Sequence, residues 1–321
     1  MIVYKNYPLS KILYYKIGGI ARYVLKIENK EDLLGALDFV KKNKIQKILP
    51  VGLGSNLLMS ENFFDGAILC FSKGESSGIK LIGENLIEAF ASELLDDVIK
   101  FSFENNLVGL EWAGGLPSTV GGAVRGNVGA FGGEIKDVVN TVEIVKLLDE
   151  GYSLEELTRE QLEFGYRDSF IKRSKDILVV SVTFQLQKAS KEELEKAKET
   201  YFAKIAYRNK NHPSGFPSCG SVFKNITKKE EVDKMLSIWE DMSELVKEKW
   251  HNKASMGYVI RRLGFAGFRI GGAEVSKKHA NYIVNVDGAK FADVISIIEK
   301  IKEKFFQTFG FSPELEVEIV S

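Results

Sequence analysis

The chain has few cysteines and histidines, and neither sign of charge is in excess. Cys70 and Cys219 are the two cysteines among 321 residues, too few for a disulfide framework or a four-thiolate metal site. His212, His251 and His279 do not have metal-ligand spacing, so no metal site is predicted. Lys+Arg and Asp+Glu both number 44, which gives a formal net charge of zero. Such a balance provides no field to hold a polyanion, so nucleic acid is not expected as a partner.

Long apolar runs are also missing. No stretch approaches the roughly 18 apolar residues that span a membrane, and residues 1–19 have neither the apolar run nor the cleavage site of a signal peptide. We therefore expect a cytoplasmic protein that does not engage a membrane. The chain is 45% hydrophobic and 27% charged, so it can bury a sizeable core. Its length suggests two or three domains.

Apolar periodicity predicts an alternation of strands and helices in the first part of the chain. A strand over 21–27, a helix over 30–43 and a strand over 47–51 form one unit that ends in a glycine turn. The pattern then predicts a helix over 94–105 and strands over 66–71, 79–82, 86–90, 138–148 and 177–187. A charged helix over 191–208 is interpreted as a connector. Beyond it we predict helices over 229–250, 253–263 and 289–309, and strands over 281–286 and 314–320. The main boundary is placed near residue 200, and the last strand is expected to return to the first half.

The first of two glycine-rich loops directly follows the strand over 47–51. Its members are Gly52, Gly54, Ser55 and Asn56. Glycines after a strand let backbone N–H groups approach a phosphate without an intervening Cβ. Leu57 occupies the third-glycine position of a dinucleotide fingerprint, and no Gly-Lys-Ser/Thr follows as in a Walker loop. Taken alone, the loop is equally compatible with an ordinary tight turn.

The second loop, residues 114–127, is rich in small residues and hydroxyls. A flexible linker would be more polar and would lack Leu116, Val120 and Val124. Such a segment can line a narrow slot for a diphosphate with N–H groups and hydroxyls. Two such loops favour one long ligand with a pyrophosphate in its middle. The residues that we expect to contact it are Gly52, Gly54, Ser55 and Asn56 of the first loop and Gly115, Pro117, Ser118, Thr119, Gly121, Gly122 and Asn127 of the second.

These loops and further segments, in the same order, resemble the enolpyruvoylglucosamine reductase family over nearly the whole chain. The segments are residues 16–19, 52–58, 114–127, 164–169, 217–225, 271–280 and 315–318. Two departures are modest: the family usually has Met-Asn where Gly126-Asn127 stands, and a proline where Ile226 stands. The short stretch between Arg167 and Ser221 lacks the extra tyrosine-bearing loop of longer members, which indicates the shorter subclass.

The resemblance implies an α+β fold. A FAD-binding domain of the vanillyl-alcohol oxidase (PCMH) type is expected over residues 1–200, completed by the strand over 314–320. A substrate-binding α+β domain is expected over residues 201–305. FAD is expected to be bound noncovalently, because neither glycine loop contains a histidine. NADPH would serve as co-substrate, and a UDP-sugar carrying an enolpyruvyl ether would be reduced to UDP-N-acetylmuramate for peptidoglycan synthesis. A monomer is expected.

The resemblance also implies three catalytic residues. Arg167 would face the negative charge that builds on the substrate as an enolate. Ser221 would donate a proton to the neighbouring carbon, and it would need help from Lys224 or Arg167 because a free serine is a poor acid. Glu318 would be the third catalytic residue. Three residues of the same motifs are expected to bind the substrate: Tyr166, Lys224 and Asn225.

Alternation along residues 314–320 places carboxylates on one face of the predicted strand. Leu315, Val317 and Ile319 would share one face, and Glu314, Glu316 and Glu318 the other. Glu316 is the fallback for Glu318. Cys219 is interpreted as a buried filler, and His279, although in a family motif, is given no chemical role.

Two rival functions remain at this point. Another FAD-dependent sugar or lactone oxidoreductase would reuse both glycine loops but would not need the segments around Arg167 and Ser221. A non-enzymatic flavin or nucleotide-binding module would not require Arg167, Ser221 and Glu318 to act together.

Overall fold

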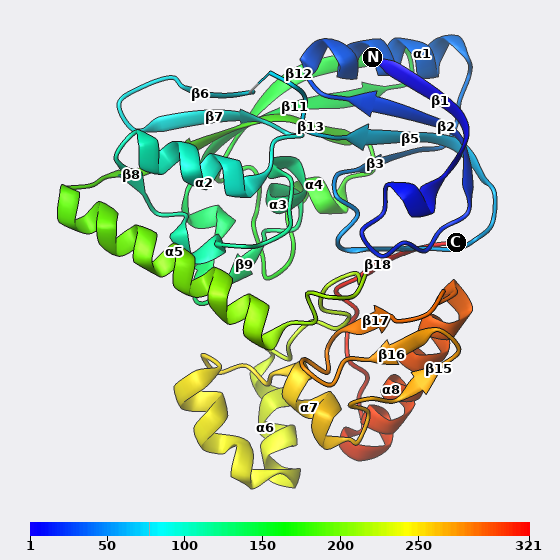
Figure 1. The fold of residues 1–321 in the computed structure, drawn as a ribbon, viewed down its shortest axis with the longest axis vertical. Helices are drawn as coiled ribbons and strands as arrows, with labels where there is room; N and C mark the ends of the chain where they lie inside the picture. The colour runs from blue at the N-terminus through cyan, green and yellow to red at the C-terminus, as the bar shows by residue number, and fades with distance from the viewer. Residues whose placement is uncertain (77) are drawn as a thin grey trace. The chain divides into compact units, whose positions relative to one another are not determined.

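The computed structural model describes residues 1–76 and 78–321, which form two compact units (Figure 1). The first unit contains residues 1–7, 21–53 and 63–210, and the second contains residues 8–20, 54–62 and 211–321. The second unit is therefore discontinuous, since two short early segments join the last part of the chain. The first glycine-rich loop is divided between the two units, with residues 52–53 in the first and residues 54–56 in the second. Residues 314–320 belong to the second unit. The functional boundary near residue 200 stays a prediction.

A four-stranded sheet of order β1-β2-β5-β3 forms one part of the first unit (Figure 1). Strand β5 lies between β2 and β3 and pairs in parallel with both. The side chain of Asn29 accepts a hydrogen bond from the Asp32 N–H and so starts the helix that follows β2. The predicted strand–helix–strand unit is confirmed, with β5 inserted between its strands. The bounds are β1 (Ile2–Pro8), β2 (Ile20–Ile27), α1 (Lys30–Lys42), β3 (Ile48–Val51) and β5 (Phe64–Phe71).

A second, antiparallel sheet has the order β12-β11-β13-β7-β6. Its bounds are β6 (Ile79–Leu81), β7 (Leu86–Phe90), β11 (Val139–Leu148), β12 (Gly151–Thr158) and β13 (Ile177–Gln185). Strand β12 was not predicted. It is a largely exposed edge strand, so it lacks the apolar alternation that marks a half-buried one. Its Leu-Glu-Glu-Leu sequence also favours helix over strand.

One hydrophobic core joins both sheets of the first unit with its helices. Helix α5, expected as a mere connector, contributes Leu194, Ala197 and Tyr201 to this core at helical spacing. The Tyr201 hydroxyl donates a hydrogen bond to Asp96 at 2.7 Å. The helix is thus an integral part of the first unit. The remaining elements here are α2 (Leu95–Glu104), β8 (Leu107–Val108), α3 (Val120–Arg125), β9 (Gly129–Ala130), β10 (Gly133–Glu134), α4 (Phe170–Arg173), β14 (Gln187–Lys188) and α5 (Lys191–Asn211).

The second unit has its own core, built around the buried face of its longest helix, α8. Tyr15 is buried in this core and donates a hydrogen bond to the Ile283 carbonyl at 2.8 Å, which attaches the early segment 8–20. A three-stranded sheet has the order β15-β16-β17, and β4 pairs in parallel with β18. The bounds are β4 (Leu57–Met59), α6 (Lys229–Ile238), α7 (Met256–Arg262), β15 (Arg269–Ile270), β16 (Ala273–Val275), β17 (Ile283–Asn285), α8 (Phe291–Phe309) and β18 (Glu318–Val320).

The predicted helix over 229–250 is wrong in its second half. Helix α6 ends at Ile238 because Trp239 leaves helical geometry, with φ −125° and ψ 70°. The Trp239 ring packs edge-on against Phe309, with centroids 4.8 Å apart, and the Arg262 guanidinium lies 4.3 Å from its centroid. Residues 240–242 and 245–249 then form a 3-10 turn and a π turn. The apolar spacing of residues 229–250 is therefore compatible with a helix followed by tight turns as well as with one continuous helix.

The predicted strand over 314–320 is also shorter than expected. Only Glu318–Val320 forms a strand, and it pairs with Leu57–Met59. The predicted shared face of Val317 and Ile319 is wrong, since Val317 is 4% exposed and Ile319 is 38% exposed. The chain changes partners here, from residues 222–224 to β4, and strict alternation is lost. Among the described residues, no helix combines the length and apolarity that crossing a bilayer demands.

Candidate functional site

The two glycine-rich loops touch in the first unit. A Cβ on Gly52 would stand 2.4 Å from Oγ1 of Thr119, so these residues are in direct contact. The Thr119 hydroxyl accepts a hydrogen bond from the Gly122 N–H at 3.3 Å. The Ser118 hydroxyl donates to the Thr119 carbonyl at 2.9 Å. The prediction that both loops serve one ligand is therefore compatible with their contact.

Backbone hydrogen bonds fix the second loop to residues 91–95. The N–H groups of Val120 and Gly121 donate to the carbonyls of Glu93 and Ala91, at 2.8 and 3.0 Å. These two donors are used within the fold. The surface that the loop exposes consists of backbone and proline rather than long side chains, at Gly115, Pro117 and Gly122. Such a surface, with the Ser118 hydroxyl beside it, fits a diphosphate like that of FAD.

The end of the first loop belongs to the second unit, where it holds the last strand. The side-chain amide of Asn56 donates to the Glu316 carbonyl at 3.0 Å. The Asn56 carbonyl accepts from the Glu318 N–H, also at 3.0 Å. Asn56, predicted as a cofactor ligand, thus also fixes the segment that carries both candidate carboxylates. Gly54 and Ser55 precede it.

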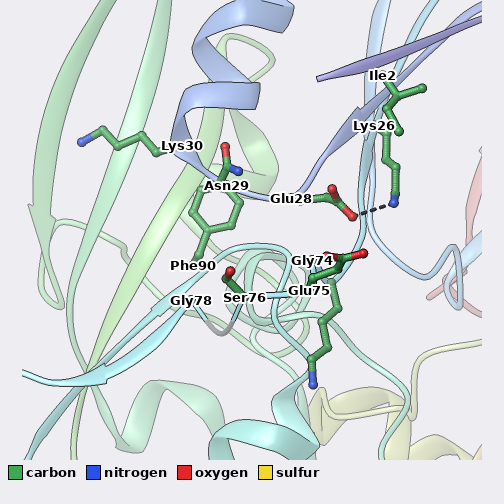
Figure 2. A pocket seen from close by; sticks show the side chains of 11 residues that line it. Ile2, Lys26, Glu28, Asn29, Lys30, Gly74, Glu75, Ser76, Gly78 and Phe90 are labelled. Carbon is green, nitrogen blue, oxygen red and sulfur yellow. Dashed lines mark ion pairs between the residues drawn. The ribbon is translucent and has the colours of Figure 1, made fainter.

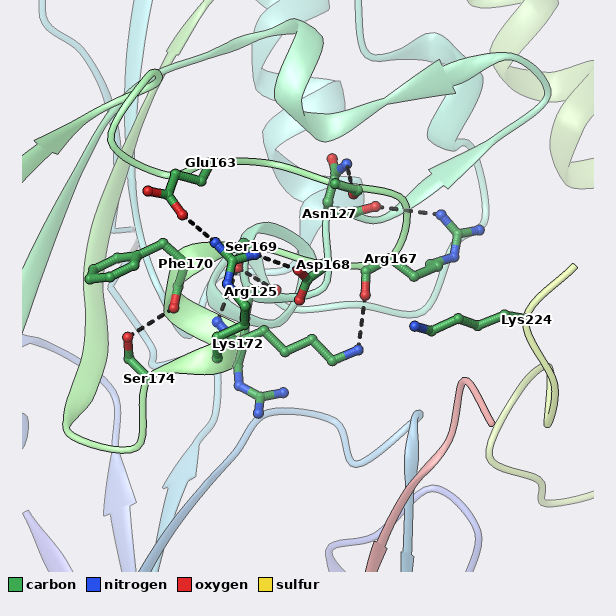
Figure 3. Close-up of polar contacts among 12 residues, drawn as sticks. Arg125, Asn127, Glu163, Arg167, Asp168, Ser169, Phe170, Lys172, Ser174 and Lys224 are labelled. Atoms are coloured by element: carbon green, nitrogen blue, oxygen red, sulfur yellow. Dashed lines mark hydrogen bonds and ion pairs between the residues drawn. The ribbon is translucent and has the colours of Figure 1, made fainter. Parts of the chain in front are cut away.

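Arg167 stands at the tip of a tight turn in the first unit (Figure 3). Gly165 and Asp168 exchange two backbone hydrogen bonds, at 3.0 and 3.2 Å, and Tyr166 and Arg167 lie between them. Arg167 has φ +56°, in the left-handed region. This turn position usually holds glycine or asparagine. A residue with a Cβ is disfavoured there by about 1–2 kcal/mol, so surrounding contacts must hold the arginine in place.

Backbone carbonyls hold the guanidinium of Arg167. Its Nη2 donates to the Gly129 carbonyl at 2.6 Å, and Nη1 donates to the Asn127 carbonyl at 3.4 Å. A Cβ on Gly129 would lie 3.2 Å from Nη1 and 2.8 Å from Cγ of Glu134. Only glycine therefore lets the guanidinium approach so closely. The fork of the arginine is thus oriented by fixed backbone dipoles.

Asn127 joins the second glycine loop to this turn. Its side chain is fully buried, and the amide nitrogen donates to Oε2 of Glu134 at 3.0 Å and to the Gly165 carbonyl at 2.7 Å. The amide oxygen accepts from the Lys136 N–H at 3.2 Å. Asn127 was predicted to contact the cofactor, and both of its side-chain N–H groups are used inside the first unit.

Charged side chains surround the base of the Arg167 turn (Figure 3). Arg173 forms ion pairs with Asp168 and Glu163. Lys172 donates from its ammonium group to the Arg167 carbonyl at 3.0 Å. The buried Ser169 hydroxyl donates to the Arg125 carbonyl at 2.7 Å, which ties the turn to the end of α3. The turn is thus fixed on its outer side by ion pairs and on its inner side by buried hydrogen bonds.

Ser221 lies in the second unit, in a bulge beside β17. Ser218 forms a β-bridge with Val284, and the Val222 N–H donates to the Asn281 carbonyl at 2.8 Å. Between these two anchors Gly220 takes φ +73°. Ser221 is half-buried at the end of this bulge. The backbone on both sides of the predicted proton donor is therefore fixed.

Cys219, in the same bulge, is fully buried, as expected of a filler. Burial raises the pKa of its thiol to about 12. The thiol is therefore protonated at physiological pH and is a poor nucleophile.

The C-terminal segment runs beside residues 222–224. The Glu316 N–H donates to the Val222 carbonyl at 2.8 Å, and the Lys224 N–H donates to the Glu314 carbonyl at 2.9 Å. The Lys224 ammonium lies 3.2 Å from Oε2 of Glu314, which is exposed. The structure thus brings the segment of Ser221 and the segment of the candidate carboxylates together within the second unit.

Glu316 and Glu318 are both half-buried, so burial does not choose between them. Asn225, predicted to bind substrate, accepts a hydrogen bond on Oδ1 from the Met256 N–H at 3.0 Å and so caps the start of α7. This bond uses the amide oxygen of Asn225 and does not involve its side-chain N–H groups.

Two residues that sequence reasoning missed support the predicted ones. Gly129 makes room for the Arg167 guanidinium, and Asn281 holds Val222. Gly129 lies at the end of the glycine-dense stretch, and Asn281 directly follows the family segment 271–280. These positions next to recognised motifs were the sequence features that could have indicated a role for Gly129 and Asn281. Among the described residues, no group of three His, Cys, Asp or Glu side chains is arranged to hold a metal ion.

A cavity of about 640 Å³ lies elsewhere in the first unit (Figure 2). It is lined by the end of β2, the start of α1, the loop after β5 and Phe90. Its lysines have acidic partners: Lys26 lies 2.6 Å from Glu28, and Lys73 lies 2.7 Å from Asp97. Its described lining includes none of the predicted site residues.

Comparison with known proteins gives matches in both parts of the chain. Residues 21–152 match the family described as FAD binding domain, and residues 212–320 match the family described as UDP-N-acetylenolpyruvoylglucosamine reductase, C-terminal domain. The chain is 37% identical over 319 residues to the UDP-N-acetylenolpyruvoylglucosamine reductase of Caldicellulosiruptor bescii, with 98% of this chain and 90% of that protein covered. The enzyme of the same name from Lactobacillus johnsonii is 34% identical, with 99% and 94% covered.

A solved structure agrees with these sequence matches. The crystal structure of UDP-N-acetylenolpyruvylglucosamine reductase from Thermus caldophilus aligns with a TM-score of 0.74 at 25% identity, covering 100% of this chain and 98% of that one.

Proposed function

Because the chain belongs to the UDP-N-acetylenolpyruvoylglucosamine reductase family, we propose that Arg167, Ser221 and Glu318 carry out the catalytic steps of this reductase. The protein is a FAD-dependent oxidoreductase of peptidoglycan synthesis, with a FAD-binding domain of the PCMH type and a C-terminal domain characteristic of the family. Bound FAD supplies the electrons that NADPH delivers and that the enolpyruvyl group of the UDP-sugar receives. The settings of the protein's own residues support the roles proposed for them below.

The observation that carries the proposal is the setting of Arg167. An arginine in a disfavoured backbone conformation, with its guanidinium oriented by the carbonyls of Asn127 and Gly129, is a costly arrangement for a surface side chain. A planar fork held in a fixed direction suits a carboxylate whose charge grows as an enolate forms. We assign Arg167 the stabilisation of that charge.

Ser221 is proposed as the proton donor. Its hydroxyl sits in a bulge whose two flanks are anchored, which suits a group that must meet one carbon of the substrate. Lys224, three residues further on, can lower the cost of removing the proton. Glu318 is proposed as the third catalytic residue, with Glu316 as the alternative, because the same segment lies beside residues 222–224.

The cofactor and substrate contacts are proposed as follows. The contact of Gly52 with Thr119 and the exposed backbone of the second loop support FAD binding there. For Asn127, whose side-chain and backbone N–H groups are already used, the remaining groups are the second lone pairs of its amide and backbone oxygens. The proposed FAD contacts are Gly52, Gly54, Ser55, Asn56, Gly115, Pro117, Ser118, Thr119, Gly121, Gly122 and Asn127, and the proposed substrate contacts are Tyr166, Lys224 and Asn225.

We further propose a cytoplasmic monomer of the shorter subclass, with noncovalent FAD. Between Arg167 and Ser221 the chain forms α4, β13, β14 and α5, and the stretch between α5 and Ser221 is brief, which supports the subclass. The lack of histidine in either glycine loop supports noncovalent attachment.

Absorbance spectroscopy of the purified protein tests these proposals. The flavin band should bleach with NADPH and return when UDP-N-acetylglucosamine enolpyruvate is added under anaerobic conditions. Reoxidation by simple sugars or lactones instead would favour the rival oxidoreductase, and bleaching without reoxidation by any of these would favour a binding module. Acid precipitation should release all of the yellow colour into the supernatant, and colour retained by the precipitate would contradict noncovalent binding.

A further inference from the structure

The family segment over 271–280 has no role in the proposed reaction, yet the residue that directly follows it contacts the Ser221 bulge. Asn281 is 3% exposed. Its amide oxygen accepts from the Phe223 N–H at 3.0 Å, and its amide nitrogen donates to the Phe223 carbonyl at 2.8 Å. Its backbone carbonyl accepts from the Val222 N–H at 2.8 Å. One asparagine thus occupies three of the four backbone hydrogen-bonding groups of the two residues after Ser221.

Asn281 is itself fixed by the preceding turn. The Ser276 hydroxyl accepts from the N–H groups of Lys278 and His279, at 3.2 and 3.3 Å. The Asn281 N–H lies 3.4 Å from Nδ1 of His279. The His279 ring packs against Gly257, where a Cβ would stand 2.8 Å from the ring. The anchor for residues 222–223 therefore rests on a turn that is packed against α7.

We infer that Asn281 is a positioning residue for Ser221, an inference that rests on the proposed role of Ser221 as proton donor. Three contacts hold the bulge: the Ser218 bridge to Val284, the bonds of residues 222–224 to the C-terminal segment, and the bonds of Asn281 to Val222 and Phe223. Of these, only the Asn281 contact uses a side chain, so a substitution can remove it selectively. Phe223 is fully buried, so an unpaired N–H or carbonyl there would be costly and the segment would shift to satisfy it. A shift of about 1 Å at a reacting group can cost roughly 10²-fold in rate.

The carboxamide of Asn281 fits both bonds to Phe223, because it offers a donor and an acceptor on the same planar group. Asn281→Asp keeps the size and the acceptor but removes the donor and faces a carboxylate oxygen toward the Phe223 carbonyl. Asn285 provides a matched control. It lies in the adjoining strand β17, and its side chain bonds to the Tyr15 carbonyl and the Ala289 N–H instead. Asn285→Asp thus perturbs the strand next to Asn281 without altering a side-chain bond to residues 222–223.

The test uses the FAD-loaded full-length protein and follows each half-reaction by stopped-flow absorbance. Asn281→Asp should reduce flavin with NADPH at a near-normal rate and reoxidise with the enolpyruvyl substrate roughly 10–10² times more slowly. In a Ser221→Ala background the same substitution should add no further slowing, since it acts through Ser221. Hydrogen exchange at the Val222 and Phe223 amides should accelerate in Asn281→Asp, and Asn285→Asp should leave both readouts near wild type.

The outcomes separate the inference from the function on which it rests. If Ser221→Ala does not slow reoxidation, the proposed role of Ser221 is wrong and the inference falls with it. If Ser221→Ala slows reoxidation but Asn281→Asp does not, or if its effect is undiminished in the Ser221→Ala background, Asn281 is a structural residue only. Should Asn281→Asp yield no folded flavoprotein, Asn281→Ser, which removes one bond to Phe223 without adding a charge, gives the same comparison with a smaller expected loss.

Discussion

The turn that carries Arg167 and the bulge that carries Ser221 each hold one candidate catalytic side chain in place, but in different chemical surroundings. Each is a short irregular segment with one residue at positive φ, Arg167 itself in the first unit and Gly220 in the second. Each is fastened by a buried asparagine that donates to a backbone carbonyl, Asn127 to Gly165 and Asn281 to Phe223.

The surroundings differ in polarity. The Arg167 turn is encircled by ion pairs and by carbonyls that receive its N–H groups. The neighbours of Ser221 in the chain include Cys219, Val222 and Phe223, all of them buried and apolar. A permanently charged guanidinium needs fixed dipoles to aim it, whereas a hydroxyl needs only a fixed backbone. The comparison teaches that the charged group is positioned here by polar contacts to its own side chain, and the neutral donor by hydrogen bonds that fix the backbone beside it.

Removing the hydroxyl should give the largest effect. Ser221→Ala should leave flavin reduction by NADPH near its normal rate and slow reoxidation by the enolpyruvyl substrate about 10²–10⁴-fold, the scale of a lost general acid. Ser221→Cys should retain more activity, because a thiol can still donate a proton. Stopped-flow absorbance of each half-reaction makes the measurement. Equal slowing of both halves in Ser221→Ala would mean a distorted pocket rather than a missing acid.

Replacing the guanidinium of Arg167 by an ammonium group should give the second-largest effect. Arg167→Lys keeps the charge but loses the planar fork held by Gly129 and Asn127, so turnover should fall roughly 10²–10³-fold while substrate affinity changes much less. Steady-state kinetics with single-turnover controls separate the two quantities. Arg159→Lys, at an exposed position of the same unit, is the matched control. A rise in KM with normal turnover would make Arg167 a binding residue only.

The buried asparagine of the first unit should have a smaller effect. Asn127→Asp loses both donors and places a carboxylate beside Glu134, so the Arg167 turn should loosen and reoxidation should slow about 10–10²-fold. Asn105→Asp, which alters only a bond to the Phe101 carbonyl at the end of α2, is the control. FAD titration accompanies the kinetics. Weakened FAD binding with normal turnover of the loaded enzyme would show that Asn127 serves the cofactor and not the turn.

The smallest effect should be on stability rather than on rate. It should arise at His279, in the second unit, which also contains the Ser221 bulge. Burial, with a further contribution from Arg261, lowers the pKa of His279 to about 4 from its ordinary value of about 6.5. Between these values the unfolded chain binds a proton that the folded chain does not, so stability falls as the pH drops from 6.5 toward 4. Between pH 7 and pH 5 the loss should be about 2 kcal/mol.

His279→Gln should remove most of this acid sensitivity, and chemical denaturation at both pH values measures it. The neighbouring rings of His212 and Tyr282 are retained in the variant, so they serve as an internal control. An identical loss of stability on acidification in wild type and His279→Gln would assign the effect to other groups.

Much of the fold could be predicted from the sequence because most elements bury one face. Helices α1, α2 and α8 have apolar residues at helical spacing, and they appear within two residues of the predicted bounds. Strand β12 escaped prediction because it is an exposed edge. The break at Trp239 escaped because its cause, packing against Phe309 and Arg262, lies far along the chain.

The candidate catalytic residues could be found through their sequence motifs. The residues that hold them in place, Gly129 and Asn281, could not. Arg167 and Ser221 stand in segments that resemble a family, so their positions could be proposed from sequence alone. Asn281 contacts Phe223 across 58 positions, and Arg167 contacts Gly129 across 38. No local pattern encodes such a meeting, because it is created by the turns and strands between the two residues.

The discontinuous second unit has a consequence for the order in which the chain is made. Residues 1–210 hold the whole of the first unit, which can fold while the ribosome is still translating the rest. The partners of Tyr15 and Leu58, both without exposed surface in the finished protein, are supplied from residue 211 onward. Asn56 must wait for Glu316, which is synthesised 260 positions later. During that interval two apolar segments lack their partners on the nascent chain, and such transiently exposed apolar surface is where aggregation can begin.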